Sequence, residues 1–405
     1  MRHEGYLPGS SGYRRIVWSL FAAGLATFTL LYSTQALLPD LRRDFDVSTG
    51  ASTLSVSLAM FGIGAGLLIA GPLSDVVGRT RLIHLSLGAS VVIGFASALA
   101  PTWEALLALR FADGFALAGL PAVATAYLRE ELHPSSQGRA AGLYVGGTAF
   151  GGMSGRLVSG FGAELGGGWR WGIAATVLVG LACAVLVRLA LPASRGFEPA
   201  PGNPRALAAM TRRALSDPAL LALYAIGGCS LGAMVALFNT IGFRLADPPF
   251  ALGIGAASLV FLVYPLGTVS STWFGDLADR HGRRTVIPIG AAVAIVGALL
   301  TLPDVLSLVV AGMGLLVIGF FAVHGVASGW VPLRAHLGGT SAGQAASLYL
   351  FTYYLGSAVF GTASGAAWTR AGWPGSVGLS VALLLLVVVL AVLLRRTPSL
   401  VPGVR

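Results

Sequence analysis

The sequence contains no lysine, so all 26 residues counted as Lys or Arg are arginines. A phosphate-binding loop ending in Gly-Lys-Ser/Thr therefore cannot occur, which excludes ATP hydrolysis by such a loop within this chain. Acidic residues are also few, 16 in all, which leaves a formal net charge of +10. Only two cysteines, Cys183 and Cys229, are present. We therefore expect no disulfide framework, no bound metal and no cofactor.

Charged residues are scarce, at 10% of the chain, whereas apolar residues make up 55%. A soluble globular protein has about a quarter of its residues charged, so the sequence predicts an integral membrane protein. Because the alternating segments of about ten residues that form a membrane β-barrel are absent, we expect an all-α fold with twelve transmembrane helices. Apolar runs near the roughly 20 residues that cross a bilayer as a helix fall at 16–38, 51–70, 82–100, 105–127, 138–162, 171–191, 219–243, 252–274, 286–302, 305–330, 342–367 and 374–394.

One half of the sequence repeats the other. The segment Gly71–Arg79 recurs as Gly275–Arg283, with Gly, Leu, Asp, Gly and Arg in the same relative places. A second segment, Gly138–Tyr144, recurs as Gly343–Tyr349. The offsets are 204 and 205 residues, about half the chain. We therefore predict two pseudo-symmetric halves of six helices each.

The boundaries of the halves follow from the apolar runs. We place the first half at residues 1–191 and the second at residues 219–405. Residues 192–218 between them are rich in Pro, Arg, Gly and Ser, and we expect a linker that carries a short surface helix near residues 205–215.

Arginines are distributed unevenly between alternate loops. With the N-terminus inside, only Arg42, Arg43, Arg170, Arg244 and Arg370 fall outside. Since cytoplasmic loops carry the excess of basic residues, we predict a multi-pass protein of the plasma (inner) membrane with both termini and the linker cytoplasmic. This sidedness accounts for the net charge, so we expect the lipid bilayer and no nucleic acid as a partner.

The repeated loop carries an acid and a basic cluster in a tight turn. Its carboxylate can cap a neighbouring helix N-terminus, and its guanidinium groups can hold lipid headgroups. Such contacts can form in one conformation and break in another; the alternative for the arginines is that they only satisfy the cytoplasmic excess of positive charge. The candidate gating residues are Gly71, Asp75, Gly78, Arg79, Arg81, Gly275, Asp279, Arg280, Gly282 and Arg283.

Ionisable residues at membrane depth are costly and are candidates for function by default. Arg110 and Asp113 are three residues apart on one predicted helix, where they can pair. The pair is either a salt bridge that fixes this helix or a proton site in which Arg110 sets the pKa of Asp113 or binds a substrate anion. Arg156, in the outer part of its span, can extend outward to the interface. His324 is either a core histidine or a proton carrier, because its ordinary pKa lies near neutrality.

Polar and aromatic residues within the spans predict a cavity for a small molecule. Tyr32 and Gln35 on the first span match Phe238 and Asn239 on the seventh through the repeat. Membrane proteins built from such repeats bind their ligands near the bilayer midplane at the repeat interface. Weaker candidates, for which an interfacial belt or helix packing is the alternative, are Tyr144, Tyr264, Tyr349 and Tyr353.

Gly147, Gly151 and Gly155 recur at four-residue spacing on the fifth span. Such a stripe of small residues lets two membrane helices approach closely. Packing alone explains it; a functional hypothesis adds that the partner helix lies across the interface between the two halves.

The repeated loop and the span-4 motif resemble the major facilitator superfamily. Gly71–Arg81 is similar to the signature loop that follows the second span in that superfamily, and Gly275–Arg284 is similar to its weaker copy. Arg110–Gly114 resembles the span-4 arginine motif. The resemblance implies transport by alternating access, with Asp75 in an inter-domain latch that stabilises the outward-open state.

Two further segments, Gly151–Arg156 and Ala345–Gly356, resemble the YnfM-type branch of bacterial inner-membrane exporters, often grouped with drug or arabinose efflux permeases. The antiporter signature on the fifth span usually contains a Gly-Pro pair, whereas residues 150–153 here are Phe-Gly-Gly-Met. That departure weakens the prediction of proton antiport.

The sequence thus predicts a secondary transporter that exports a small organic compound in exchange for protons. The alternative is a facilitator or symporter of small organic anions, favoured by Arg110 and Arg156 against a single membrane-depth acid. Gly228–Gly232 matches a nucleophile pattern but lies in an apolar span without the strand-turn-helix context that gives it meaning. We expect a monomer that is not an enzyme.

Overall fold

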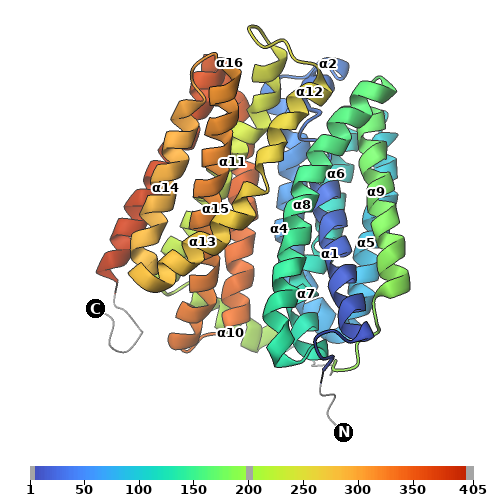
Figure 1. Ribbon diagram of the computed structural model, residues 1–405, viewed down its shortest axis with the longest axis vertical. Coiled ribbons are helices and arrows are strands. Elements are labelled where there is room, and N and C mark those ends of the chain that lie inside the picture. The colour runs from blue at the N-terminus through green and yellow to red at the C-terminus, as the bar shows by residue number, and fades with distance from the viewer. Residues whose placement is uncertain (1–4, 198–203, 398–405) are drawn as a thin grey trace. The chain divides into compact units, whose positions relative to one another are not determined.

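The computed structural model of the protein describes residues 5–197 and 204–397 (Figure 1). Within these ranges it is helical and contains no β-strand, only an isolated bridge between Tyr6 and Leu132. Ten helices of the described chain are long and apolar enough to cross a membrane. The last of these contains two spans, because α16 (Ala342–Leu393) leaves helical geometry at Ala371 and Gly372. With that division and with α8 (Pro134–Gly166), whose many glycines lower its hydropathy, the twelve predicted spans are accounted for.

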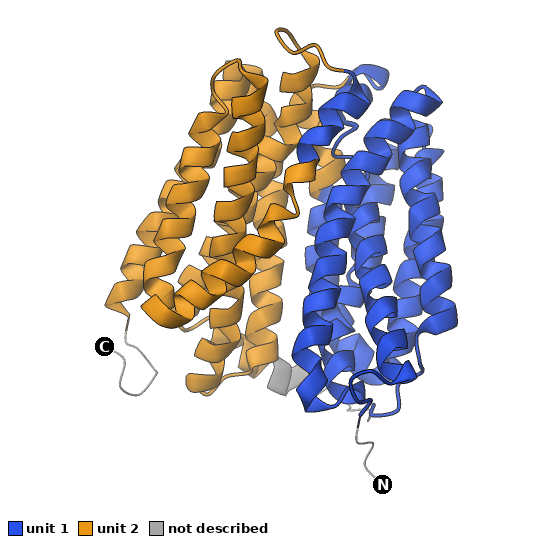
Figure 2. Ribbon diagram, in the orientation of Figure 1, with its two compact units in different colours: residues 1–46, 58–202, 253–261 blue, residues 47–57, 203–252, 262–405 orange. Residues whose placement is uncertain are grey.

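The chain folds into two compact units, each a bundle of long helices (Figure 2). Unit 1 comprises residues 1–46, 58–202 and 253–261. Its helices are α1 (Ser11–Leu31), α2 (Leu38–Asp44), most of α4 (Leu54–Val77), α5 (Arg79–Ala98), α6 (Trp103–Leu117), α7 (Gly119–Glu131), α8, α9 (Trp169–Ala190) and α12 (Ile254–Ser258).

Unit 2 comprises residues 47–57, 203–252 and 262–405. Its helices are α3 (Thr49–Ser52), α10 (Pro204–Ala214), α11 (Pro218–Ala246), α13 (Leu266–His281), α14 (Arg283–Leu300), α15 (Leu306–Leu337) and α16, with short 3-10 turns η1 (Leu259–Val263), shared with unit 1, and η2 (Leu394–Arg396). The short helix predicted in the linker is α10. The units are not contiguous in sequence, because α3 belongs to unit 2 and α12 to unit 1.

Glycines end the second helix of both repeats in the same way. Gly78 follows α4 with φ +97°, and Gly282 follows α13 with φ +85°. This region of backbone conformation favours glycine because it has no Cβ. The repeated glycine of the loop is therefore a requirement of its turn, independent of any role in gating.

The glycine stripe on α8 packs against α1. A Cβ on Gly151 would lie 2.5 Å from the carbonyl oxygen of Leu25, and one on Gly155 would lie 2.5 Å from that of Thr29. Gly147 meets the backbone of Phe21 in the same way. The predicted close helix pair is confirmed. The hypothesis that its partner belongs to the other half is wrong for these glycines, because α1 of the same unit fills the space.

Candidate functional site

A buried ion pair on α6 joins two of the predicted site residues. Arg110 Nη1 lies 2.6 Å from Asp113 Oδ2, and both side chains are 1% exposed. Arg110 also donates to the carbonyl oxygens of Leu31, at 2.7 Å, and Leu30, at 3.4 Å, at the end of α1. The predicted pairing is confirmed. The guanidinium therefore connects the acid on α6 to the last turn of α1.

Arg156 lies at the centre of a second buried group, the arginine cluster, which also contains Gln35, Tyr32 and Phe261. Arg156 is fully buried and donates to Gln35 Oε1 at 2.5 Å and to the Gly152 carbonyl at 2.6 Å. Its Cζ lies 3.9 Å from the centre of the Tyr32 ring and 5.3 Å from that of Phe261. The prediction that Arg156 extends outward is wrong, because cation–π and amide contacts hold it inside.

The backbone explains how Tyr32 and Gln35 reach this cluster. The first apolar run was predicted to be helical over residues 16–38, but α1 ends at Leu31 and residues 32–37 form turns. Within these turns the Gln35 N–H donates to the Tyr32 carbonyl at 3.1 Å. The segment therefore presents both side chains at the point where α1 meets Arg110.

A histidine cluster forms in unit 2 from His324, Tyr349, Tyr353 and Phe320. His324 Nδ1 and the Tyr349 hydroxyl are 2.9 Å apart. The His324 ring lies 4.6 Å from the Tyr353 ring and stacks on Phe320 at 5.8 Å with an interplanar angle of 4°. Three predicted candidates are thus brought together, and Phe320, which was not among the predicted site residues, completes the group.

The matched residues of the second half occupy an equivalent position in unit 2. Asn239 Nδ2 donates to the Gly361 carbonyl at 3.3 Å, and 205 residues earlier the position of Gly361 is that of Arg156. Phe238 is fully buried and meets the ring of Tyr264 edge-on. Tyr144, also buried, lies twelve residues before Arg156 on α8, about 18 Å along the helix, and does not join the arginine cluster.

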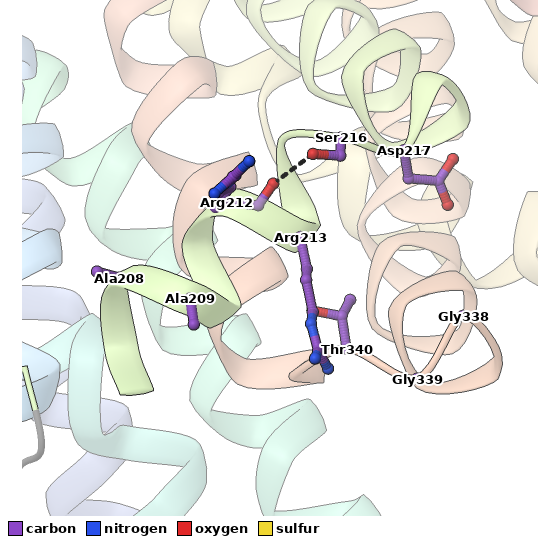
Figure 3. A pocket seen from close by; sticks show the side chains of 9 residues that line it. All are labelled: Ala208, Ala209, Arg212, Arg213, Ser216, Asp217, Gly338, Gly339 and Thr340. Atoms are coloured by element: carbon purple, nitrogen blue, oxygen red, sulfur yellow. Dashed lines mark hydrogen bonds between the residues drawn. The ribbon is translucent and has the colours of Figure 1, made fainter. Parts of the chain in front are cut away.

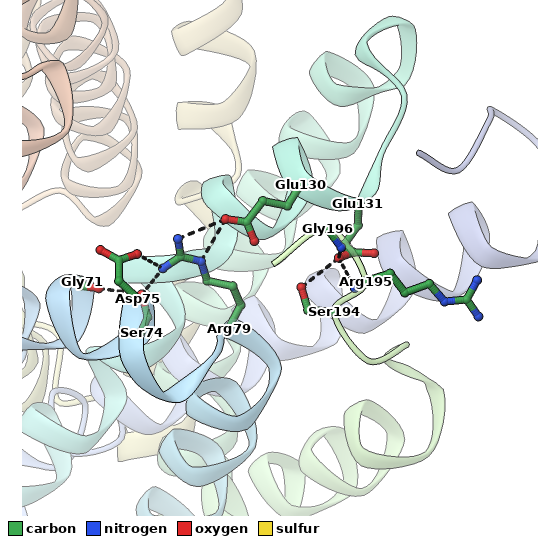
Figure 4. A network of polar contacts seen from close by, with 9 residues as sticks. All are labelled: Gly71, Ser74, Asp75, Arg79, Glu130, Glu131, Ser194, Arg195 and Gly196. Carbon is green, nitrogen blue, oxygen red and sulfur yellow. Dashed lines mark hydrogen bonds and ion pairs between the residues drawn. The ribbon is translucent and has the colours of Figure 1, made fainter. Parts of the chain in front are cut away.

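The first copy of the repeated loop is held by ion pairs (Figure 4). Arg79 lies 2.6 Å from Asp75 and 3.0 Å from Glu130 of α7, and it also donates to the Ser74 hydroxyl. Ser74 in turn donates to the Gly71 carbonyl. Among the described residues Asp75 does not form the expected helix cap: its carboxylate pairs with Arg79, and α5, whose N-cap is Gly78, has no side-chain cap.

Glu131 organises the segment that follows α9. Its Oε1 accepts hydrogen bonds from the Ser194 hydroxyl and from the N–H groups of Arg195 and Gly196, at 2.6 to 2.9 Å (Figure 4). Neither Glu130 nor Glu131 was among the predicted site residues. Both lie, like Asp75, where a positive-inside bias favours bases, and that position was the available signal.

The second copy of the loop has different contacts. In the described part of the chain, no ion pair is formed by Asp279, Arg280 or Arg283. The neighbouring Arg284 instead donates to the carbonyl oxygens of Arg395, at 3.2 Å, and Thr397, at 2.8 Å. The two predicted gates are thus alike in backbone and unlike in side-chain bonding.

Two further kinds of site, a metal centre and a nucleophilic serine, find no support among the described residues. No group of three or more His, Cys, Asp or Glu side chains there could hold a metal ion. Ser230, the centre of the nucleophile-like pattern, is fully buried within α11 and donates to the Gly227 carbonyl at 3.0 Å. Its hydroxyl is therefore a helix-packing group.

Comparisons with known sequences agree on one family. The pattern described as the Major Facilitator Superfamily matches residues 20–274. YybF of Bacillus subtilis (strain 168), described as an uncharacterized MFS-type transporter, is 39% identical over 96% of this chain and 95% of its own length. YnfM of Escherichia coli (strain K12), described as an inner membrane transport protein, is 40% identical over 94% of this chain and 90% of its own length.

Solved structures of lower identity share the fold. A bacterial homologue of the human lysosomal transporter Spinster, in an inward-facing and unoccupied conformation, superposes with a TM-score of 0.77 at 17% identity and covers 96% of this chain and 98% of its own. The nucleoside transporter NupG superposes with a TM-score of 0.71 at 17% identity and covers 94% of this chain and 99% of its own.

Proposed function

This chain belongs to the major facilitator superfamily of secondary transporters, and from that premise we propose that it exports a small organic compound in exchange for protons. Members of the family bind small-molecule substrates and work in a lipid membrane. Export takes place across the plasma (inner) membrane, with both termini cytoplasmic, as the distribution of arginines favours. The protein acts as a monomer and without enzymatic chemistry.

The observation that carries proton coupling is the buried pair on α6. Asp113 is the carboxylate buried at membrane depth in unit 1, and Arg110 lies 2.6 Å from it. Burial favours the protonated acid, whereas the guanidinium favours the carboxylate. A change in the Arg110 contact during transport therefore changes the proton affinity of Asp113, which is what coupling requires.

The end of α1 couples this proton site to the substrate. Arg110 binds the Leu31 carbonyl, and the next residue, Tyr32, lies against Arg156. When Asp113 takes up a proton, Arg110 loses its anionic partner and its hold on α1 changes. The adjacent Tyr32 and Gln35 then shift the arginine cluster, where the substrate binds.

The loop network acts as the gate. The carboxylates of Asp75 and Glu130 share the Arg79 guanidinium, so movement of α4 against α7 exchanges one contact for another. These contacts are partly exposed and individually weak, which suits a latch that must open in each cycle.

A second candidate function is supported by the arginine cluster. A fully buried guanidinium flanked by two aromatic rings can receive a carboxylate through bidentate hydrogen bonds. On this basis the alternative is a facilitator or symporter of small organic anions. A facilitator of this kind does not require a pH gradient for transport.

Everted membrane vesicles test the proposal. A panel of labelled organic compounds, divided into anions, neutral compounds and cations, is offered with and without an imposed pH gradient. Antiport predicts accumulation of at least one compound only with an acidic lumen, and its loss in Asp113→Asn. If an anion is transported at the same rate with and without the pH gradient, and this transport depends on Arg156, the result contradicts antiport and favours the facilitator. An exposed arginine variant, Arg139→Gln, serves as the control for expression and insertion.

A further inference from the structure

A basic cavity lies between α5 and the end of α9 in unit 1. It has a volume of about 560 Å³ and is lined by Thr80, Arg81, His84, Leu85, Arg188, Leu191 and Ala193. Arg81 and Arg188 are exposed and His84 is half-buried. No carboxylate lines the cavity, and none of its three basic side chains forms an ion pair within the described residues. Its charge is therefore available to an anion.

The walls of the cavity are fixed by bonds to the rest of unit 1. The Ser194 N–H donates to the Thr80 hydroxyl at 3.0 Å, which holds the segment after α9 against α5. The Tyr127 hydroxyl donates to the Pro192 carbonyl at 2.7 Å, and Glu131 binds three donors of residues 194–196. The Glu131 carboxylate is thus engaged with the segment that follows α9. The cavity is a preformed site rather than a gap beside a loose loop.

The surroundings of the cavity identify the source of the anion. Leu85 on its wall is 63% exposed, and Leu189 beside Arg188 is 76% exposed. Only 28% of the residues in the apolar stretch of α9 are buried within the protein, so most of this helix faces lipid. The basic groups lie at the end of both helices, where a bilayer places its headgroups.

Unit 2 contains a larger cavity that shows the contrast (Figure 3). It has a volume of about 750 Å³ and lies between α10 and residues 338–340, with Arg212 and Arg213 on its wall. Asp217 also lines it, and the C-terminal ends of α10 and α15 adjoin it, so negative potential opposes an anion there. The cavity in unit 1 also adjoins one helix C-terminus, that of α9, but the N-terminal end of α5 faces it and no carboxylate lines it.

We propose that the cavity formed by Arg81, His84 and Arg188 binds a phosphate group, supplied by the headgroup of an anionic phospholipid. Basic pockets between transmembrane helices on the cytoplasmic side suit such headgroups, and each arginine near the surface contributes about 1 kcal/mol to the attraction. The acyl chains then lie along the exposed apolar face of α9. The site adjoins the loop of Arg79 through Thr80, so occupancy stabilises the segment that the loop network holds.

Native mass spectrometry of the full-length protein in detergent tests this site. The protein is titrated with phosphatidylglycerol and with phosphatidylcholine of the same acyl chains. The test variant is Arg81→Gln with Arg188→Gln, and the matched control is Arg14→Gln with Arg139→Gln, which removes two exposed arginines of the same unit. We expect one phosphatidylglycerol bound in preference to phosphatidylcholine, an affinity about 30-fold lower in the test variant, and an unchanged affinity in the control.

Inorganic phosphate distinguishes the two sources of the ligand. If millimolar phosphate raises the unfolding temperature of the wild type but not of the test variant, while the two lipids bind equally, the site takes a soluble phosphate compound. If the test variant elutes as aggregate, His84→Gln replaces it and is expected to weaken binding by a smaller factor. Equal phosphatidylglycerol binding by all folded variants, or no response to either lipid charge or phosphate, overturns the proposal.

Discussion

The two copies of the repeated loop share a sequence and a backbone but not their bonds. In the first copy, Asp75 and Glu130 both pair with Arg79. In the second copy the position of Glu130 is taken by Ala335, 205 residues later, and no ion pair joins Asp279 to Arg283 among the described residues. The second copy therefore has the same glycine turn as the first, but it lacks an acid at the position of Glu130, which completes the ion pairs of Arg79 in the first copy.

The same difference extends into the membrane-spanning helices. The positions that match Arg110 and Asp113 in the second half are Leu315 and Ile318, and the position that matches Arg156 is Gly361. The helix pairs themselves are retained: Gly356 packs on Gly228 as Gly151 packs on α1. The shared scaffold therefore carries different side chains: the buried Arg110–Asp113 pair and Arg156 lie in the first half, whereas the second half has His324 among aromatic rings.

The largest effect should come from removing the titratable group of the first half. Asp113→Asn keeps the shape of the side chain but cannot exchange a proton, so accumulation driven by a pH gradient should be abolished while downhill exchange continues. His324→Gln, in the second half, should leave gradient dependence intact. Measuring both variants in everted vesicles decides the comparison, and full accumulation by Asp113→Asn would remove this acid from the coupling mechanism.

Replacing Arg110 by the residue at the matching position of the second half should lower the stability of the protein strongly. Arg110→Leu leaves a buried Asp113 without its counter-ion and should cost about 3 to 5 kcal/mol. The double variant Arg110→Leu with Asp113→Ile restores the apolar pair of the second half and should recover much of that loss. Unfolding temperatures in detergent report both, and a double variant less stable than the single one would contradict the argument.

The fold was largely predictable because its determinants are local. Runs of apolar residues, glycine turns and the repeat itself require no knowledge of distant contacts. The pairing of Arg110 with Asp113 was predictable for the same reason, since three-residue spacing places both on one helix face. The α8 glycine stripe predicted close packing, but its partner could not be read from one helix, and α1 proved to be that partner.

The remainder of the candidate site depends on contacts between segments far apart in sequence. Arg156 was expected to extend outward because its depth in the span was the only guide, whereas Gln35, Tyr32 and Phe261 surround it from other elements. Glu130 was missed because its partner Arg79 lies 51 residues away. The position of a residue within a span predicts whether its burial is costly. It does not predict which residues from other segments supply the contacts that offset this cost.

The helix pair common to both halves allows a matched test of packing. Gly151→Leu places a side chain against the Leu25 backbone, and Gly356→Leu places one against Gly228. Overpacking of this kind costs about 1 to 3 kcal/mol, and both variants should lower the unfolding temperature and reduce transport. Gly142→Leu on α8, where a Cβ has nothing within 4 Å, is the control. Normal transport by Gly151→Leu would mean that α1 and α8 separate easily.

The loop network predicts a smaller effect, confined to the first half. Glu130→Ala reproduces the second copy, and Asp75→Asn removes the other carboxylate around Arg79. Each should shift the balance of conformations by about 1 kcal/mol or less and lower transport several-fold at equal membrane levels. Asp279→Asn, in the loop without ion pairs, should have little effect on transport. Equal effects of Asp75→Asn and Asp279→Asn would show that the observed bonding does not distinguish the two gates.

The smallest predicted difference concerns how the first helix of each half is capped. Ser10, which does not titrate, caps α1, whereas Asp217 caps α11 and binds Arg334 at 2.8 Å. Burial alone raises the pKa of Asp217, but hydrogen bonds from Arg334 and the Ala219 N–H outweigh it and hold this pKa below its ordinary value. The stabilisation is therefore present above the ordinary aspartate pKa of about 4 and is lost as the pH falls through the lowered one.

Asp217→Asn retains an amide that can cap α11 but removes this pH dependence. On acidification from pH 5 to pH 3, the free energy of unfolding should fall further in the wild type than in the variant, by less than about 1 kcal/mol. Unfolding temperatures across this range measure the difference, with Ser10→Ala as the control that lowers stability equally at every pH. Parallel curves for the wild type and Asp217→Asn would show that the Arg334 contact contributes no pH-dependent stability. The charge of the α11 cap would then make no difference between the two halves.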